Sequence, residues 1–422
     1  MKAAAGLVLA AALLAAPAPA QEPGGDPTEI IDALLTGLMG FTDMTGPELQ
    51  NEVAAAGGIA FRSDVPVEFM TRGELSRYLA DLLDSEYPAD RAEADQRTLL
   101  ALDLLPHGSD LRAMRTRLLE ENIVGFYDER PGKKRLYAVS EQRRLTPANQ
   151  LILSHEMRHA LQDQYADLHD MLPASVGDFD DRRIAFLSVL EGDATLVMER
   201  FLMRKLGGGE GDKDKEEEMP PFSMPVPPMP NVPPVLRDQL LLPYFAGRDF
   251  AQALQKKGGW DAVKQAWVRP PESTEQVLHP EKYDAREGPK PVDLSYAPRG
   301  GRMINEGVLG EVLVKTFLGD AASDEASAGW GGDRFRVWDL SGRTMLVWRS
   351  VWDSSSDAAE FLSAAQSRLA SAHGAEPARR GFRVFAAPPW RFAIAERAGG
   401  VDFISSDDGQ AFEAALDALG GS

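Results

Sequence analysis

Apolar residues recur every three or four positions through much of the first two thirds of the chain, which is the spacing of one buried face of an α-helix. The stretch FLSVLEGDATLVM at 186–198 is apolar almost all round, as expected of a fully buried helix. Gly258 and Gly259 interrupt the apolar pattern of residues 240–267 and are expected to separate two helices there. The pattern predicts helices over 29–55, 72–83, 99–104, 110–121, 147–164, 186–198 and 240–267.

Strand-like runs fall in two regions of the sequence. A short run at 65–70 is followed by IVGFYD and KRLYAVS within 122–140, which the turn-rich ERPGK separates. In the C-terminal third, runs at 335–340 and 344–352 alternate like a hairpin. The rest of that third is predicted to form helices over 305–317, 357–370 and 410–419 and strands near 382–385, 392–396 and 401–404.

These elements predict an α+β fold. Residues 207–237 are rich in glycine, charge and proline, so they cannot build a packed core, and we expect a surface insertion there; a strap over a cleft is the alternative. The glycine-rich AGWGGDR lacks the setting and the lysine of a phosphate-binding loop and predicts a tight turn near the core. The expected segments are a signal peptide (1–20), N-terminal helices with a sheet and the site helices (21–206), the insertion (207–237), a helical part (238–300) and a C-terminal α+β unit (301–422).

Composition narrows the class of protein. A content of 44% hydrophobic residues in a chain of 422 supports packed cores. The formal net charge of −20 argues against a surface that binds nucleic acid or an anionic membrane. The chain has no cysteine, which excludes disulfides and lipid attachment at a lipobox. A monomer is expected.

The first twenty residues have the layout of an export signal. Lys2 precedes an apolar run at 3–16 that is too short to span a bilayer, and APA at 18–20 forms a cleavage site. We therefore expect a mature protein that is secreted or periplasmic. No later apolar run is long enough to cross a bilayer, so no membrane span is expected after signal cleavage.

The candidate chemistry lies in LILSHEMRHALQDQ at 151–164, where His155, Glu156 and His159 form an HExxH pattern inside a predicted helix. Two histidines four positions apart lie on one helix face, so their ring nitrogens can converge on one ion. The glutamate lies beside that face and can reach a water on the metal. This pattern is typical of a zinc hydrolase site. The alternative is a pair of core histidines satisfied by hydrogen bonds.

A catalytic zinc needs a third protein ligand and an open position for water. Glu191 is our candidate, because a carboxylate in so apolar a helix is costly unless it is paired or bound to a metal. Gly192 would let two helix backbones approach closely. The alternative is an ion pair of Glu191 with Arg182 or Arg183. Rival ligands in the preceding loop are His169, Asp178, Asp180 and Asp181.

At these residues the chain resembles the zincin metallopeptidases, and among them the gluzincins, whose third ligand is a glutamate on a following helix. The pairing of HExxHALQDQ with a later EGDA is similar to a group of exported bacterial proteins of that type. Three further stretches carry the likeness: GFYDERPGKKRLYAVS, PPESTEQVLHPEKY and AGWGGDR. The resemblance implies a zincin-like core with a mixed sheet, zinc held by His155, His159 and Glu191, and Glu156 as general base.

One position departs from the gluzincin pattern. Thermolysin-like gluzincins have an aspartate four residues after the glutamate ligand, where it orients a ligand histidine, but this chain has Thr195 there. Asp163 and Asp193 are the candidates for accepting the outer N–H of a ligand histidine. The alternative for both is an ordinary solvated carboxylate on a helix.

Two further roles follow from the resemblance. Zincins place a hydrogen-bond donor opposite the metal, where it stabilises the oxyanion. His279 and Tyr283 are the first candidates for this donor, Tyr244 and Tyr165 are weaker ones, and a structural role is the alternative for each. The run KRLYAVS is expected to be a sheet edge that pairs with an extended substrate, an ordinary hairpin being the alternative.

The expected function is therefore that of an exported zinc metallopeptidase acting on a peptide or protein substrate. The alternative is a non-catalytic zincin-fold binding or assembly protein of the cell envelope, in which zinc is structural. Glu156 argues against that alternative, because a purely structural site has no need of a base.

Overall fold

The computed structural model describes residue 36 and residues 42–171, 179–206, 229, 231–319 and 323–420. The predicted signal peptide, residues 29–35 and 37–41 of the predicted helix over 29–55, and most of the insertion over 207–237 lie outside these residues. Within 42–55 of that helix, residues 42–45 are not helical and the rest lie in α2. The predicted α+β class is confirmed. In chain order the elements are α2 (Gly46–Gly57), β1 (Val67–Met70), α3 (Arg72–Glu86), α4 (Ala89–Ala101), α5 (Leu111–Asn122), β2 (Gly125–Asp128), β3 (Arg135–Val139), α6 (Pro147–Ala166), α7 (Leu168–Met171), α8 (Asp181–Lys205), α9 (Pro234–Val268), α10 (Thr274–Leu278), α11 (Pro280–Ala285), β4 (Arg302–Gly307), α12 (Gly310–Leu318), α13 (Ser323–Ser327), β5 (Trp330–Leu340), β6 (Arg343–Trp352), α14 (Ser355–Ala372), β7 (Gly374–Arg379), β8 (Phe382–Ala387), β9 (Trp390–Arg397), β10 (Gly400–Ser406) and α15 (Gly409–Gly420).

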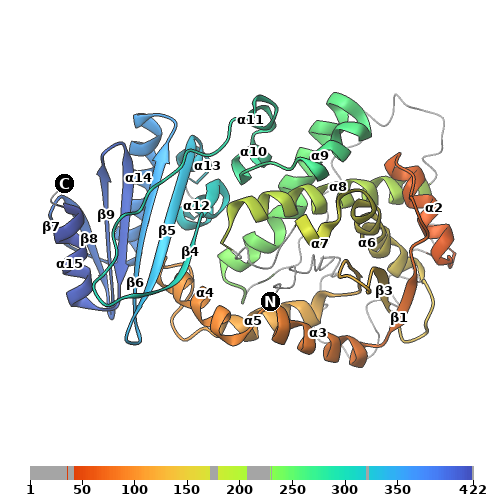
Figure 1. The fold of residues 1–422 in the computed structure, drawn as a ribbon, viewed down its shortest axis with the longest axis horizontal. Helices are drawn as coiled ribbons and strands as arrows, with labels where there is room; N and C mark the ends of the chain where they lie inside the picture. The colour runs from red at the N-terminus through yellow and green to blue at the C-terminus, as the bar shows by residue number, and fades with distance from the viewer. Residues whose placement is uncertain are drawn as a thin grey trace.

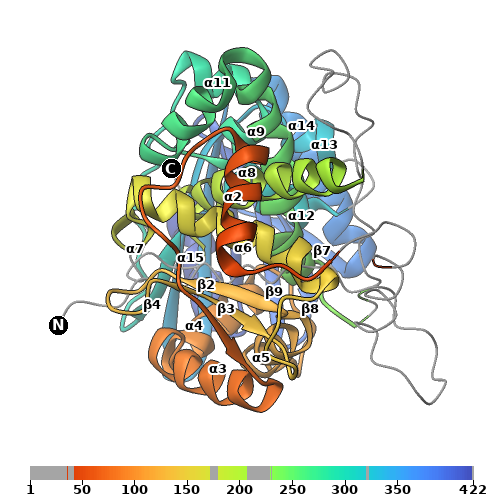
Figure 2. The ribbon, with the colours of Figure 1, turned by 90° about the vertical axis from the view of Figure 1, so that its right-hand side faces the viewer.

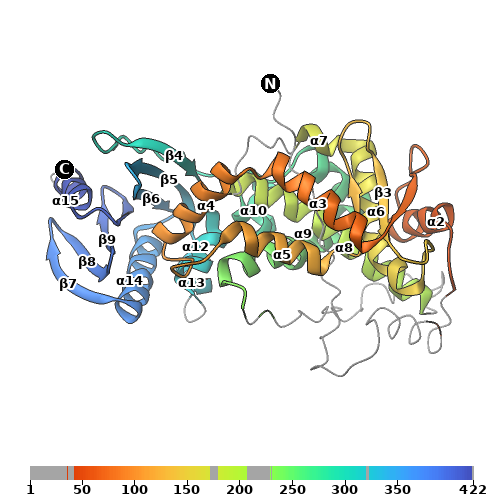
Figure 3. The same cartoon turned by 90° about the horizontal axis from the view of Figure 1, so that it is seen from below.

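The molecule is elongated, with the C-terminal sheet at one end and α6 and α8 toward the other (Figures 1 and 3). Helices α3, α4 and α5 run along one side of the molecule between these two parts (Figure 3). No helix of the described residues is both long enough and apolar enough to span a bilayer.

A small mixed sheet supports the site helix α6. Its strand order is β1-β3-β2, with β1 parallel and β2 antiparallel to β3. The sheet lies between α6 and α3 (Figure 2). Alternate side chains point to opposite faces, so Phe126 and Tyr137 pack with α3 while Tyr127 and Leu136 pack with α6. The strand predicted as the edge, KRLYAVS, is β3 and lies in the centre. The edges are β1 and β2, and this corrects the expectation.

Three long helices, α6, α8 and α9, form the centre of the part of the molecule that precedes the C-terminal sheet. Helix α6 begins with Pro147 after Thr146, as predicted. Helix α8 packs on both α6 and α9, and most of its side chains are buried, as its uniformly apolar sequence predicted. Helix α9 contains Gly258 and Gly259 in non-helical conformations, so the two predicted helices meet at a kink there. Its first residue, Pro234, also shows that the predicted insertion ends earlier than residue 237.

The C-terminal unit is a seven-stranded antiparallel sheet with helices on both faces. Its strand order is β4-β5-β6-β10-β9-β8-β7. One face buries Trp348 and Phe403 against α12 and α14, and the other buries Met345 and Phe382 against α15. This division follows from the two-residue period of the strands, which puts neighbouring side chains on opposite faces.

Several sequence predictions in and near this unit were wrong in detail. The predicted helix over 305–317 is strand β4 followed by the shorter helix α12, and β7 was not predicted. The predicted helix over 99–104 is α4, which ends at Ala101. The stretch AGWGGDR is mainly the start of β5 rather than a turn. Only Gly329 has the left-handed conformation of a turn, and the pairing of β5 with β6 is irregular between Trp330 and Gly332.

Candidate metal centre

Three predicted ligands converge at the crossing of α6 and α8. The Nε2 atoms of His155 and His159 lie 3.1 Å apart. The Oε2 atom of Glu191 lies 2.9 Å from the first of these nitrogens and 3.4 Å from the second. All three residues are buried, and their ligand atoms lie within 4.8 Å of one another. This triad can hold a metal ion.

The spacing of the three donor atoms fits a small tetrahedral ion. Ligand atoms placed 2.0–2.1 Å from such an ion lie about 3.3 Å from one another. The distances in the triad scatter around that value. Because each donor already points at the other two, the triad requires only a small adjustment to surround an ion. A tetrahedral ion held by two imidazole nitrogens and one carboxylate oxygen would have one coordination position left for a fourth ligand.

The three rival ligands within the described residues do not take part in the triad. Asp180 caps α8, where its carboxylate accepts the backbone N–H groups of Arg182 and Arg183. The Asp181 carboxylate accepts two hydrogen bonds from Thr274. His169 lies on the short helix α7 and belongs to no candidate metal cluster of the described residues. The fourth rival, residue 178, lies outside the described residues.

The electrostatics of the triad are those of a carboxylate between two imidazoles. Burial favours the neutral carboxyl, but the charge of His159 and hydrogen bonds from both rings outweigh burial and lower the pKa of Glu191 to about 2. Burial also disfavours charge on His159, yet the Glu191 carboxylate outweighs it and raises the pKa of His159 to about 9. Burial dominates at His155 and lowers its pKa. Without an ion, therefore, His159 carries the proton that neutralises Glu191.

Glu156 lies beside the triad and is fully buried. Its Oε2 atom accepts the backbone N–H of Tyr127 in β2 at 3.1 Å, while its Oε1 atom has no hydrogen-bond partner among the described residues. Burial, which is only partly opposed by the His159 charge, raises the pKa of this carboxyl well above its usual range. The structure thus holds one carboxylate oxygen in place and leaves the other without a protein partner.

The outer nitrogen of His159 forms a hydrogen bond with the side-chain amide of Gln162, a contact that was not predicted from the sequence. Gln162 Oε1 lies 2.8 Å from His159 Nδ1. Asp193 reaches His159 only through this amide, and Asp163 instead accepts the Tyr127 hydroxyl and pairs with Lys134. The expectation that Asp163 or Asp193 bonds a ligand histidine directly is corrected. The available signal was the position of Gln162, three residues after His159 on the same helix face.

A buried ion pair lies behind this amide. Arg158 donates from Nε to Asp193 Oδ2 at 2.9 Å and from Nη2 to Oδ1 at 3.0 Å, and both side chains are completely buried. The Arg158 guanidinium also lies 5.1 Å from the ring centres of Trp260 and Trp267, both in α9. The pair joins α6 to α8, and the aromatic contacts extend the connection to α9.

Tyr244 of α9 also lies at the triad. Its ring stacks on that of His155 at 5.7 Å between centres and 23° between planes. Burial, the charges of Glu191 and Glu156 and a hydrogen bond to Glu191 raise the pKa of the Tyr244 hydroxyl well above its usual value. Tyr244 was predicted as a weaker candidate for the oxyanion donor than His279 and Tyr283, but of these three residues it is the one that lies at the triad.

The two residues predicted first for that role lie elsewhere. His279 Nε2 bonds the Glu311 carboxylate of α12 at 3.1 Å, and the Tyr283 hydroxyl donates to the carbonyl of Arg269. Helix α10 contacts the first turn of α8, about 15 Å of helix before Glu191. The expectation that His279 or Tyr283 faces the metal is therefore corrected. Tyr165 also lies elsewhere, with its hydroxyl donating to the Ala60 carbonyl.

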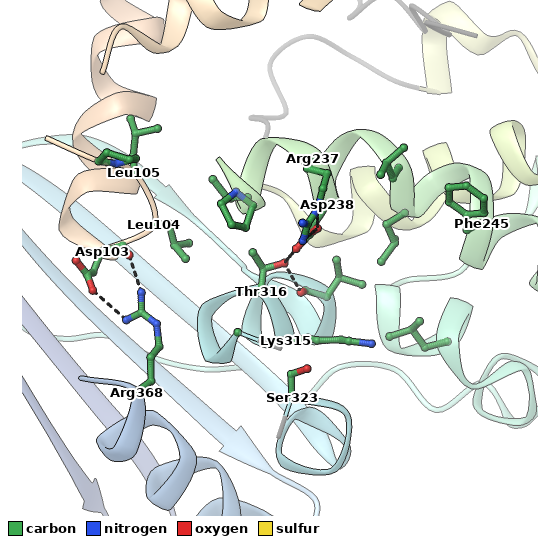
Figure 4. A pocket seen from close by; sticks show the side chains of 18 residues that line it. Asp103, Leu104, Leu105, Arg237, Asp238, Phe245, Lys315, Thr316, Ser323 and Arg368 are labelled. Atoms are coloured by element: carbon green, nitrogen blue, oxygen red, sulfur yellow. Dashed lines mark hydrogen bonds and ion pairs between the residues drawn. The ribbon is translucent and has the colours of Figure 1, made fainter. Parts of the chain in front are cut away.

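A carboxylate cluster and a groove among the described residues are weaker candidates for a functional site than the triad. The carboxylates of Glu275, Glu287 and Asp353 cluster, but the Lys282 ammonium pairs with all three, so a cation already occupies their centre. A groove of about 630 Å³ lies between α9 and the C-terminal unit and contains no triad residue (Figure 4). Its charged side chains largely pair with one another, as Arg368 does with Asp103.

Comparison with known proteins adds one finding. Residues 299–414 match a family model described as "Domain of unknown function (DUF8575)". No curated protein and no solved structure matches the chain. The matched region covers the C-terminal sheet and begins close to the unit boundary expected at residue 301, whereas the triad lies in the preceding part of the chain. The function is therefore argued from the site itself.

Proposed function

We propose that the protein is an exported, zinc-dependent peptidase of gluzincin type that hydrolyses peptide bonds with Glu156 as general base. The observation that carries this proposal is the position of Glu156 beside a buried triad of two histidines and a glutamate. One of its carboxylate oxygens is fixed by the backbone of β2, and the other has no partner among the described residues. A site that only binds a metal for stability has no use for such a carboxylate.

Zinc is the proposed metal because of the donor set. Catalytic zinc sites combine imidazole nitrogens with a carboxylate oxygen and keep one position for water. Magnesium and calcium prefer oxygen ligands, which makes two imidazoles a poor site for either. When bound, zinc supplies Lewis acidity, which lowers the pKa of water to about 7 and polarises a carbonyl oxygen.

The proposed roles of the protein groups follow from their positions. Glu156 takes a proton from the attacking water and returns it to the leaving amine nitrogen. Tyr244, whose ring stacks on His155 and whose hydroxyl bonds Glu191, is the proposed donor to the oxyanion. The edge strand β2 is the proposed docking strand for an extended peptide, since within the described part of the chain it pairs with β3 alone. The Tyr127 N–H links this strand to the base.

The test compares the purified mature chain with its Glu156→Gln variant. Metal content is measured together with cleavage of casein, an unstructured substrate. We expect one zinc per chain in both proteins and cleavage by the wild type alone, with at least a ~100-fold loss in the variant. Equal cleavage by both proteins would overturn the mechanism. Zinc in both with cleavage by neither would favour the non-catalytic alternative, and absence of zinc would overturn the metal centre.

A further inference from the structure

We propose that Gln162 is the positioning residue that sets the tautomer of His159. In many metal sites a carboxylate accepts the outer N–H of a ligand histidine, and in this protein a neutral amide takes that role. The inference rests on the proposed metal centre but not on peptidase activity. It concerns how α6 and α8 prepare one ligand nitrogen for a metal ion.

The first step is the orientation of the amide. Gln162 Nε2 donates to the Leu190 carbonyl at 2.9 Å and to Asp193 Oδ2 at 2.8 Å. Both partners are acceptors only, so the amide cannot be turned over without facing its oxygen toward two other oxygens. The Gln162 oxygen must therefore face His159.

The second step transfers this orientation to the histidine. The Gln162 oxygen only accepts hydrogen bonds, and it lies 2.8 Å from His159 Nδ1. The proton of the neutral imidazole is therefore held on Nδ1, which leaves a lone pair on Nε2. That nitrogen is the one that faces His155 and Glu191. The hydrogen bond also fixes the plane of the ring, because the donor must point at the amide oxygen.

The third step concerns what holds the amide. Asp193 receives two hydrogen bonds from Arg158 besides the one from Gln162, and all three side chains are completely buried. Gln162 and Arg158 lie on α6 and Asp193 lies on α8, so the network spans the same two helices that supply the metal ligands. The Arg158 guanidinium pairs with the Asp193 carboxylate, so the partner of the Gln162 amide is itself held in place by two hydrogen bonds.

The consequence is a ligand ring whose orientation is already set, so that loss of the Nε2 proton is the main change it undergoes on binding metal. Outer hydrogen-bond partners of ligand histidines contribute about 10–100-fold to metal affinity. We expect the same range for Gln162. The Thr195 hydroxyl, which is buried without a hydrogen-bond partner among the described residues, provides no substitute for this contact.

The first experiment compares the zinc affinity of wild type, Gln162→Met and Gln164→Met by competition with a chelator. Methionine retains the length of the side chain and removes the amide. Gln164 lies on the same helix but accepts hydrogen bonds from the backbone of Arg62 and Ser63, so it is the matched control. We expect a loss of about 10–100-fold for Gln162→Met and wild-type affinity for Gln164→Met. Unchanged affinity in Gln162→Met would overturn the proposal.

The second experiment reads the tautomer directly, in the wild type and in Gln162→Met. The chain has six histidines, so labelling them with ¹⁵N gives a simple nitrogen–proton spectrum of the zinc-loaded protein. We expect one zinc-bound histidine with a slowly exchanging proton on Nδ1, and this signal should be lost in Gln162→Met. A His159 that binds zinc through Nδ1 would overturn the proposal. Failure of the wild type to bind zinc would instead overturn the metal centre, and neither result depends on casein cleavage.

Discussion

Gly192 of α8 and Gly247 of α9 are in direct backbone contact. A Cβ atom on Gly192 would overlap the carbonyl group of Gly247, and one on Gly247 would overlap the carbonyl oxygen of Ser188. This close approach lies one residue from Glu191 and three from Tyr244. It therefore fixes the separation of the two helices at the point where both reach the metal centre.

Alanine at either glycine should be strongly destabilising. We expect Gly192→Ala and Gly247→Ala each to lower the free energy of unfolding by about 3 kcal/mol or more, because backbone atoms rather than side chains must move. Denaturant unfolding measures this loss. The control is Gly73→Ala in α3, where the nearest atom to a new Cβ is 3.9 Å away and little change is expected. Equal stabilities of the three variants would contradict the close contact.

Removal of the buried guanidinium should leave a costly charge behind. We expect Arg158→Met to destabilise the protein by about 3–5 kcal/mol, because Asp193 would remain buried without its cation. The double variant Arg158→Met/Asp193→Leu should recover part of this loss, since it leaves no uncompensated charge. Denaturant unfolding of the single and double variants gives the comparison. A single variant within about 1 kcal/mol of wild type would show that the pair is not buried as described.

Loss of the carboxylate ligand should reduce bound metal. Glu191→Ala removes the only carboxylate oxygen of the triad, so zinc affinity should fall by several orders of magnitude while Glu156 remains in place. Metal analysis after dialysis against a weak chelator measures the effect. Glu275→Gln, in the cluster around Lys282, is the matched control and should retain wild-type zinc content. If the control and not Glu191→Ala lost zinc, the site would lie elsewhere.

Zinc binding should release a proton near neutral pH. The metal-free His159, whose pKa is raised to about 9, is protonated at pH 7 and must lose that proton to bind metal. Glu191, with a pKa of about 2, is already ionised. Affinity should therefore rise with pH, by up to about tenfold per unit between pH 6 and 8. Calorimetry in buffers of different ionisation enthalpy counts the released proton, and affinity that falls with pH would contradict this assignment.

The Tyr244 hydroxyl should affect turnover more than zinc content. Tyr244→Phe retains the ring that stacks on His155 and removes only the hydroxyl, so casein cleavage should fall by roughly 100-fold with little change in bound zinc. His279→Ala and Tyr283→Phe serve as controls, because these side chains bond Glu311 and the Arg269 carbonyl and should leave turnover near wild type. Wild-type turnover in Tyr244→Phe would remove it from the mechanism.

The parts of the site that follow a helical period could be predicted from the sequence. His155 and His159 share a face because they lie four residues apart, and Glu191 was identifiable as a carboxylate in an otherwise apolar helix. Both predictions use only the sequence of a single helix and require no knowledge of how helices pack. Most of the predicted helices and strands likewise follow from local sequence alone.

The parts that depend on how elements pack could not be predicted. Whether Tyr244 or His279 reaches the triad depends on where α9 and α10 lie relative to α8, and spacing along the chain does not determine this. The central position of β3 depends on the pairing of β1, which is distant in sequence. The contact of Gln162 with His159 also depends on packing, because Leu190 and Asp193 of α8 orient the amide.

The start of α8 has a consequence for attempts to divide the protein. The Asp181 carboxylate accepts both the N–H and the hydroxyl of Thr274, Gly310 packs against this carboxylate, and Val308 N–H donates to the Phe179 carbonyl. The helix that carries Glu191 is thus secured at its N-terminal end by Thr274 of α10 and by residues of the C-terminal unit. A truncated chain that stops before residue 299 would lose two of these three attachments. The start of the region that matches the family model is therefore a poor boundary at which to divide the protein.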